Sequence, residues 1–147
     1  MTGQFQLIFK RRFLPLFITQ FLGAFNDNVY KNALVILITY KLSDQLAISG
    51  PVLVSLAAGI FILPFFLFSA LAGQIADKYE KSSVIKWIKF IEIFIMLFAV
   101  LAISTNSVFL LFSILFLTGT QSTFFGPLKY SILPQHLYKD ELIGGNA

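Results

Sequence analysis

Residues 93–128 read IFIMLFAVLAISTNSVFLLFSILFLTGTQSTFFGPL, and none of these 36 residues carries a charged side chain. A helix crosses the hydrocarbon core of a bilayer with about 20 apolar residues. The stretch is therefore long enough for most of one crossing, a polar turn at residues 104–107 and a second crossing. Residues 45–76 form another uncharged run of 32 residues, which predicts a further crossing.

The composition of the whole chain of 147 residues also indicates lipid as its solvent. Hydrophobic residues make up 57% and charged residues 12%, whereas soluble domains carry about 25% charge. The alternative, a soluble helical bundle, needs a polar face at helical spacing, and residues 52–72 have none. We therefore predict an all-α membrane protein with helices over residues 13–40, 50–76, 83–104 and 107–130.

The basic residues predict how these helices are oriented. Only Lys41 lies in the first loop, whereas nine cations lie before the first helix, around the second loop or after the fourth helix: Lys10, Arg11, Arg12, Lys78, Lys81, Lys86, Lys89, Lys129 and Lys139. Cytoplasmic loops hold the excess of Lys and Arg, so both chain ends and the second loop are predicted to be cytoplasmic. This bias explains the net charge of +4 without a nucleic-acid partner.

The first helix carries polar side chains near the middle of its predicted span. Asn26, Asp27 and Asn28 interrupt the apolar sequence, while Lys31 and Gln20 extend the helix face of Asp27. An ionised carboxylate at the centre of a membrane costs at least ~2.5 kcal/mol, so it needs a partner or water. One interpretation is an Asp27–Lys31 ion pair, with the asparagines as interhelical hydrogen-bonding groups. The other, which we favour, is a polar site for a substrate or a coupling ion.

The fourth helix adds two candidates to this site. Residues 119–123, GTQST, can bond to the first or second helix, which makes Gln121 a candidate. Gly126-Pro127 is expected to bend or break the helix, and Lys129 follows at once. Lys129 either points back into a cavity or marks the cytoplasmic boundary.

Two further features of the sequence concern structure. Pro64 predicts a kink in the second helix, because proline removes one hydrogen bond of the helix. Lys89 and Glu92 are three residues apart on the third helix and can pair on one face. We interpret this pair as lying at the membrane surface.

Motifs of enzymatic chemistry are absent from the sequence. It contains no GxxxxGK loop, no HExxH pair and no Cys, and its one His is His136. Glu141 follows His136 five residues on, a chance near-match to the His-x4-Asp pattern expected of a lipid acyltransferase. We therefore predict a chain that is not an enzyme and holds no metal or cofactor.

The loop after the second helix resembles a motif of the major facilitator superfamily. The run GQIADKYEK matches the pattern G-x-x-x-D-[RK]-x-G-[RK] at Gly73, Asp77, Lys78 and Lys81, whereas Glu80 replaces the second Gly. The resemblance implies a conformational latch at these positions. Gly73 would let two helices approach closely, and Asp77 would accept hydrogen bonds from a helix N-terminus and pair with a cation.

Three other segments resemble the lysophospholipid transporter family of that superfamily. They are residues 21–28, FLGAFNDN, residues 126–134, GPLKYSILP, and residues 144–147, GGNA, which resemble the lead-in to a fifth helix. The resemblance implies a twelve-helix fold of which this chain is the first third. It also implies a secondary transporter that moves lysophospholipid across the bacterial inner membrane, with membrane lipids and the remaining helices as partners.

Two alternative functions stay open. The same module resembles the N-terminal part of bifunctional lysophospholipid acyltransferase/acyl-carrier-protein synthetases, so the chain could present lipid to a fused or associated acyltransferase without transporting it. A four-helix efflux subunit that functions as a dimer would use Asp27 as its proton carrier. Small exporters of dual topology need a weak Lys/Arg bias, and the nine-to-one distribution argues against this alternative.

Overall fold

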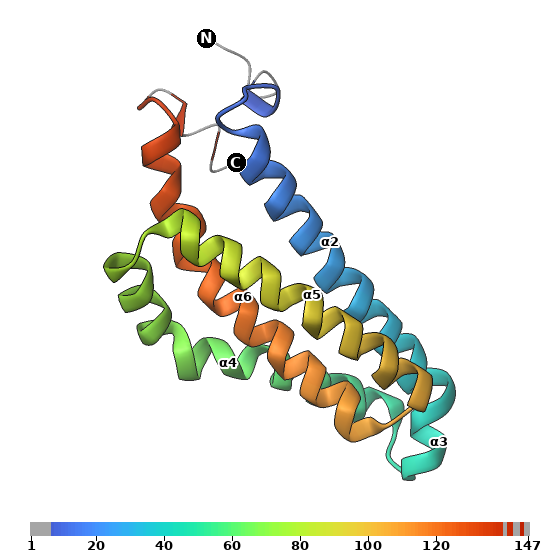
Figure 1. Cartoon of the computed structure of the whole chain (residues 1–147). Helices are drawn as coiled ribbons and strands as arrows, with labels where there is room; N and C mark the ends of the chain where they lie inside the picture. Colours follow the sequence, from blue (N-terminus) through green and yellow to red (C-terminus); the bar gives the residue numbers. More distant parts are fainter. Residues whose placement is uncertain (1–6, 140, 143–144, 146–147) are drawn as a thin grey trace.

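The computed structural model describes residues 7–139, 141–142 and 145, with only the backbone of Gln45, and long helices dominate these residues. Figure 1 shows them as an elongated bundle. Its long helices are α2 (Leu14–Leu37), α4 (Gly50–Lys78), α5 (Lys81–Thr105) and α6 (Val108–His136). A π-helical turn, η1 (Ile38–Leu42), and a short helix, α3 (Ser43–Leu46), continue α2. The all-α class and the four long helices are confirmed, whereas residues 144, 146 and 147 of the predicted lead-in lie outside the described residues.

The helix α6 holds the bundle together. It packs along α4 and α5 and also contacts α2. The largest core cluster takes residues from all four long helices, and inside it the hydroxyl of Tyr30 donates a hydrogen bond to the carbonyl of Leu111 at 2.8 Å. Because lipid is as apolar as these side chains, close packing of this cluster and the interhelical hydrogen bond of Tyr30 hold α2 to the other helices.

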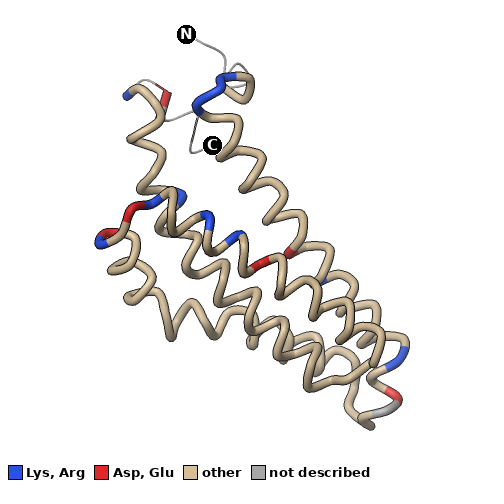
Figure 2. Tube along the Cα trace, in the orientation of Figure 1, with Lys and Arg blue, Asp and Glu red and all other residues tan. Residues whose placement is uncertain are grey.

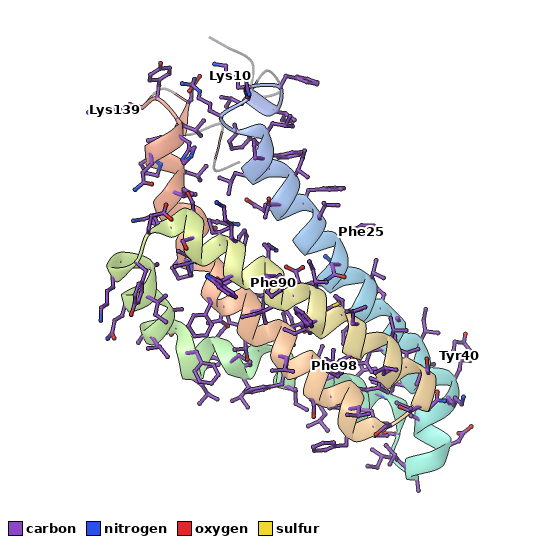
Figure 3. All side chains as sticks on the ribbon, viewed as in Figure 1. Lys10, Phe25, Tyr40, Phe90, Phe98 and Lys139 are labelled. Atoms are coloured by element: carbon purple, nitrogen blue, oxygen red, sulfur yellow. The ribbon has the colours of Figure 1, made fainter. Side chains whose placement is uncertain are left out.

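Large apolar side chains also cover the outside of the bundle (Figure 3). Phe66 and Phe109 are 81% and 79% exposed, as expected where lipid replaces water. Among the described residues, α4, α5 and α6 are long and apolar enough to cross a membrane. The helix α2 has 24 residues, but its central polar residues leave it outside this group. Of the four predicted membrane crossings, α4, α5 and α6 are therefore confirmed by length and composition, and α2 is not.

The start of α5 lies two residues before its predicted position, because Glu80 caps the helix. The Glu80 side chain accepts hydrogen bonds from the backbone N–H of Ser83 at 2.6 Å and of Ser82 at 3.0 Å. These bonds favour the charged carboxylate and hold the pKa of Glu80 below its usual value. Glu80, which replaces the second Gly of the superfamily pattern, thus accepts hydrogen bonds from backbone N–H groups in the first turn of α5.

Gly126-Pro127 is expected to bend or break the fourth helix, and the structure shows no break; the predicted helix end at residue 130 is wrong. The helix α6 continues to His136 and contains both Pro127 and Pro134. Leu128 and Leu133 are buried, so packing after Pro127 stabilises the helical path despite the lost hydrogen bond. The predicted bend remains, because α6 changes direction toward its C-terminal end (Figure 1).

The helices α4 and α6 approach each other closely at Gly119. A Cβ atom on Gly119 would collide with the carbonyl oxygen of Phe61 and lie 3.2 Å from Cγ of Pro64, where α4 is expected to kink. Figure 1 shows that α4 is bent along its length. A Cβ on Gly73 would meet no described atom within 4 Å. No described helix lies against Gly73, so its role in a close approach of two helices stays a prediction.

Gly119→Ala is expected to lower the free energy of unfolding by about 1–3 kcal/mol, because its methyl group overlaps a backbone carbonyl that cannot rotate away. Gly73→Ala is the matched control, and it should be neutral or stabilising by up to about 1 kcal/mol, since alanine favours a helix over glycine. Unfolding in mixed micelles at increasing SDS content, followed by circular dichroism, measures both. Equal stability of the two variants would contradict the close approach at Gly119.

Candidate functional site

The polar residues of α2 point in three directions in the folded chain. Asn26 and Asp27 contact α5 and α6. Asn28 is exposed, and its amide donates to a carbonyl one turn earlier in α2 at 2.8 Å. The Lys31 Nζ atom lies 4.4 Å from the ring centroid of Phe61 on α4. Asn26, Asp27 and Asn28 diverge because each helical step rotates the side chain by about 100°. Lys31 shares the face of Asp27 but lies one turn farther along α2, where α4 is the neighbour.

Asp27 forms a hydrogen bond to the fourth long helix. Its Oδ2 atom accepts from the Ser122 hydroxyl at 2.7 Å, while Oδ1 is buried and has no hydrogen-bond partner among the described residues. Within those residues Asp27 forms no ion pair with Lys31, so that part of the first interpretation is wrong. Its other part, an interhelical hydrogen bond from an asparagine, is confirmed for Asn26, which donates to Glu92 on α5. A buried acceptor without a partner costs about 1–3 kcal/mol, so a hydrogen bond from water or a ligand to Oδ1 would be stabilising.

Glu92 joins three helices in one buried network. It is 9% exposed, and its Oε2 atom accepts hydrogen bonds from Lys89 Nζ at 2.6 Å and from Gln121 Nε2 at 2.8 Å. Its Oε1 atom accepts from Asn26 Nδ2 at 3.2 Å. The predicted Lys89–Glu92 pair is confirmed, but its placement at the membrane surface is wrong, because α2 and α6 cover it. Hydrogen bonds of this kind are strengthened by the low dielectric of a protein interior.

A pocket of about 190 Å³ lies beside this network and has walls from α2, α5 and α6. Its lining brings together four of the predicted site residues with the two polar side chains just described: Gln20, Asp27, Gln121, Lys129, Lys89 and Ser122. Lys129 is half-buried and forms no ion pair among the described residues, which favours the cavity position over the boundary position.

The three other candidates of α2 do not line this pocket. Asn26 lines a neighbouring groove between α2 and α5, and Lys31 lines a separate apolar pocket of about 200 Å³ against α4. Asn28 is turned to the exposed side of α2. The structure thus divides the predicted set into residues that share a cavity and residues that do not.

Three polar residues of this region were absent from the predicted site. Lys89, Glu92 and Ser122 lie in or beside the pocket. Position along the helix could have revealed Glu92, which lies near the middle of α5, about 16 Å from its first residue. A carboxylate so far along an apolar helix needs partners inside the bundle.

The residues of the predicted latch lie at the end of α4 and the start of α5. Asp77 and Lys78 are exposed in the last turn of α4, and Lys81 is the first residue of α5. The Asp77 side chain has no hydrogen bond or ion pair among the described residues, and the N-terminus of α5 is occupied by Glu80. The role of Gly73, Asp77, Lys78 and Lys81 as a latch stays a prediction.

The segments before α2 and after α6 are joined through Glu141. This buried carboxylate pairs with Lys10 and with Arg12, whose Nη2 lies 2.6 Å from Oε2, and it accepts from the backbone N–H of Tyr138 at 3.1 Å. The hydrogen bond from Lys10 is the main cause that holds the pKa of Glu141 below its usual value. A lowered pKa means that this contact stabilises the fold at neutral pH and is lost as the pH falls through that pKa.

His136 and Glu141, the near-match to an acyltransferase pattern, have separate partners in the structure. The Nδ1 atom of His136 lies 3.2 Å from the carbonyl oxygen of Ile132, and Glu141 is held by Lys10 and Arg12. Among the described residues, no group of three or more His, Asp or Glu side chains is arranged to hold a metal ion.

These features define a class of protein, a helical membrane chain whose polar side chains converge inside an apolar bundle. No family model matches the chain, and no solved structure matches it. The chain is 27% identical over 140 residues to the lysophospholipid transporter LplT of Cronobacter sakazakii (strain ATCC BAA-894). The alignment covers 95% of this chain and 32% of that protein, so the chain spans about a third of its relative. The chain is a distant relative of LplT, which confirms the resemblance found in the sequence.

Proposed function

We propose that the chain forms the first four membrane helices of a twelve-helix major facilitator transporter that moves lysophospholipid across the bacterial inner membrane. The observation that carries this proposal is the half-open pocket at Asp27, where polar groups of three helices meet in an otherwise apolar bundle. Ionisable groups inside a membrane usually serve a transported substrate or ion. The relationship to LplT over 95% of the chain supports lysophospholipid as that substrate.

The charges around the pocket suit a phospholipid headgroup. Asp27 Oδ1 is a free acceptor for an ammonium or hydroxyl group of the headgroup. Lys129 forms no ion pair among the described residues and can bind the phosphate by a charge-assisted hydrogen bond. Lys89 is already neutralised by Glu92, so in this proposal it orders the wall of the pocket.

Reconstitution of the complete protein in liposomes tests the proposal. A lysophospholipid with a dithionite-sensitive fluorophore is placed in both leaflets, and dithionite is added outside. In protein-free liposomes, the labelled lipid of the inner leaflet is protected from dithionite. If the protein transports lysophospholipid, this lipid reaches the outer leaflet and its fluorescence is lost as well. Binding of the labelled lipid without loss of the protected fraction would favour the module that presents lipid to an acyltransferase.

The charge distribution predicts the orientation of the helices. Figure 2 shows the basic residues gathered where α2 begins, where α6 ends and around the start of α5, whereas the opposite end of the bundle, where η1 and α3 contain Lys41 and Asp44, has few. A reporter fused after Lys78 should therefore be cytoplasmic, and one fused after Tyr40 periplasmic. Phosphatase and fluorescent-protein fusions measure both positions. A periplasmic Lys78 would overturn the orientation and the major facilitator assignment together.

A further inference from the structure

A second pocket lies at the basic end of the bundle, apart from Asp27. Its cavity volume is about 350 Å³, and it lies between the beginnings of α2 and α5 and the end of α6. Its apolar lining includes Leu16 and Ile85. Its polar lining consists of two guanidinium groups, one imidazole and two hydroxyl groups: Arg11, Arg12, His136, Thr19 and Ser82. The Thr19 hydroxyl already donates to the carbonyl of Pro15 at 2.7 Å, so the guanidinium groups are the groups suited to bind a phosphate.

The carboxylates nearest to these cations are already occupied. Glu141 is paired with Lys10 and Arg12, and Glu80 accepts hydrogen bonds from the first turn of α5. Arg11 is exposed and forms no ion pair or hydrogen bond among the described residues. The pocket therefore retains a guanidinium group that is available to an anion.

The pocket lies beside a largely apolar groove between α2 and α5. This groove has a volume of about 600 Å³, and Thr19 lines both cavities. Farther from Thr19, the groove is lined by large apolar side chains that are more than half exposed: Leu22, Ile93, Leu97 and Val100. A basic pocket next to an apolar groove matches the two parts of a phospholipid.

We infer that the basic pocket binds the phosphate of an anionic diacyl phospholipid of the cytoplasmic leaflet, with an acyl chain in the groove between α2 and α5. Basic pockets between helices on the cytoplasmic side of a membrane are suited to anionic headgroups, because that leaflet is negatively charged. The basic pocket lies at the end of the bundle, whereas the groove is also lined by Asn26, Lys89 and Glu92 and so borders the central pocket proposed for transport. The inference concerns binding and holds whether or not the protein moves lysophospholipid.

Thermal unfolding of the complete protein in a neutral detergent tests this inference. Phosphatidylglycerol should raise Tm in a saturable way, whereas phosphatidylcholine and sn-glycerol 3-phosphate should not do so at the same concentrations. Arg11→Gln should raise the half-saturating concentration of phosphatidylglycerol about tenfold, since it removes a charge-assisted contact. Lys139→Gln is the matched control, because Lys139 is an exposed cation at the same end outside the pocket, and it should change that concentration less than about twofold.

Three results would overturn the inference. Equal weakening by Arg11→Gln and Lys139→Gln would mean that general surface charge attracts the lipid. An equal response to phosphatidylcholine would remove the need for an anionic headgroup. Protection by sn-glycerol 3-phosphate at the same concentration as phosphatidylglycerol would show a site for a soluble phosphate and leave the groove without a role.

Discussion

Replacement of Asp27 by Asn or Ala is expected to abolish lysophospholipid movement by the complete protein without loss of expression or membrane insertion. The reason is the position of its Oδ1 atom, a buried acceptor in the central pocket with no partner among the described residues. An amide or a methyl group at this position cannot neutralise a headgroup ammonium at membrane depth. The liposome assay described above measures the loss as a protected fraction that stays equal to that of protein-free liposomes.

The neighbouring residue provides a matched control for Asp27. Asn28 is exposed and bonds within its own helix, so Asn28→Ala should keep transport within about twofold of the parent protein.

A double variant tests the ion-pair alternative again. If Asp27 only neutralised Lys31, Asp27→Asn with Lys31→Met would restore transport, because no unpaired charge would remain. The structure shows no such pair, so the double variant should stay inactive, and full activity would remove Asp27 from the site.

Glu92→Ala should cause the largest loss of stability of any single substitution considered for this chain. It leaves Lys89 without its counter-ion inside the bundle and removes the acceptor shared by Asn26 and Gln121. Removal of one partner of a buried ion pair typically costs about 3–5 kcal/mol. Unfolding in mixed SDS micelles measures this change, with Asp44→Ala as an exposed acidic control that should stay within about 0.5 kcal/mol of the parent.

A second substitution distinguishes a lost ion pair from a lost network. Lys89→Met with Glu92→Gln removes both charges and keeps an acceptor for Asn26 and Gln121, so it should recover most of the stability lost in Glu92→Ala. If Glu92→Ala alone unfolds at the same SDS content as the parent protein, the buried network does not hold α2, α5 and α6 together.

The sequence by itself determined the helical class and the ends of most helices. The uncharged runs predict apolar helices because buried backbone groups in lipid must bond within their own segment. The turn between α5 and α6 was also predictable, since Asn106 has φ 52° and asparagine tolerates the left-handed conformation. These features depend on local chemistry, which can be read from neighbouring residues in the sequence. The continuation of α6 past Pro127 depends instead on tertiary packing, because the buried side chains of Leu128 and Leu133 stabilise it.

Only the tertiary structure decided which polar side chains meet. The sequence places Asp27 and Lys31 on one helix face, but the crossing of α2 over the bundle brings Ser122 to Asp27 and Phe61 to Lys31. Likewise, the spacing of Lys89 and Glu92 shows that they share a face, and it does not show what covers that face. Helical periodicity sets the direction of a side chain relative to its own axis, whereas its partner depends on how separate helices pack, and that depends on contacts between residues far apart in the chain.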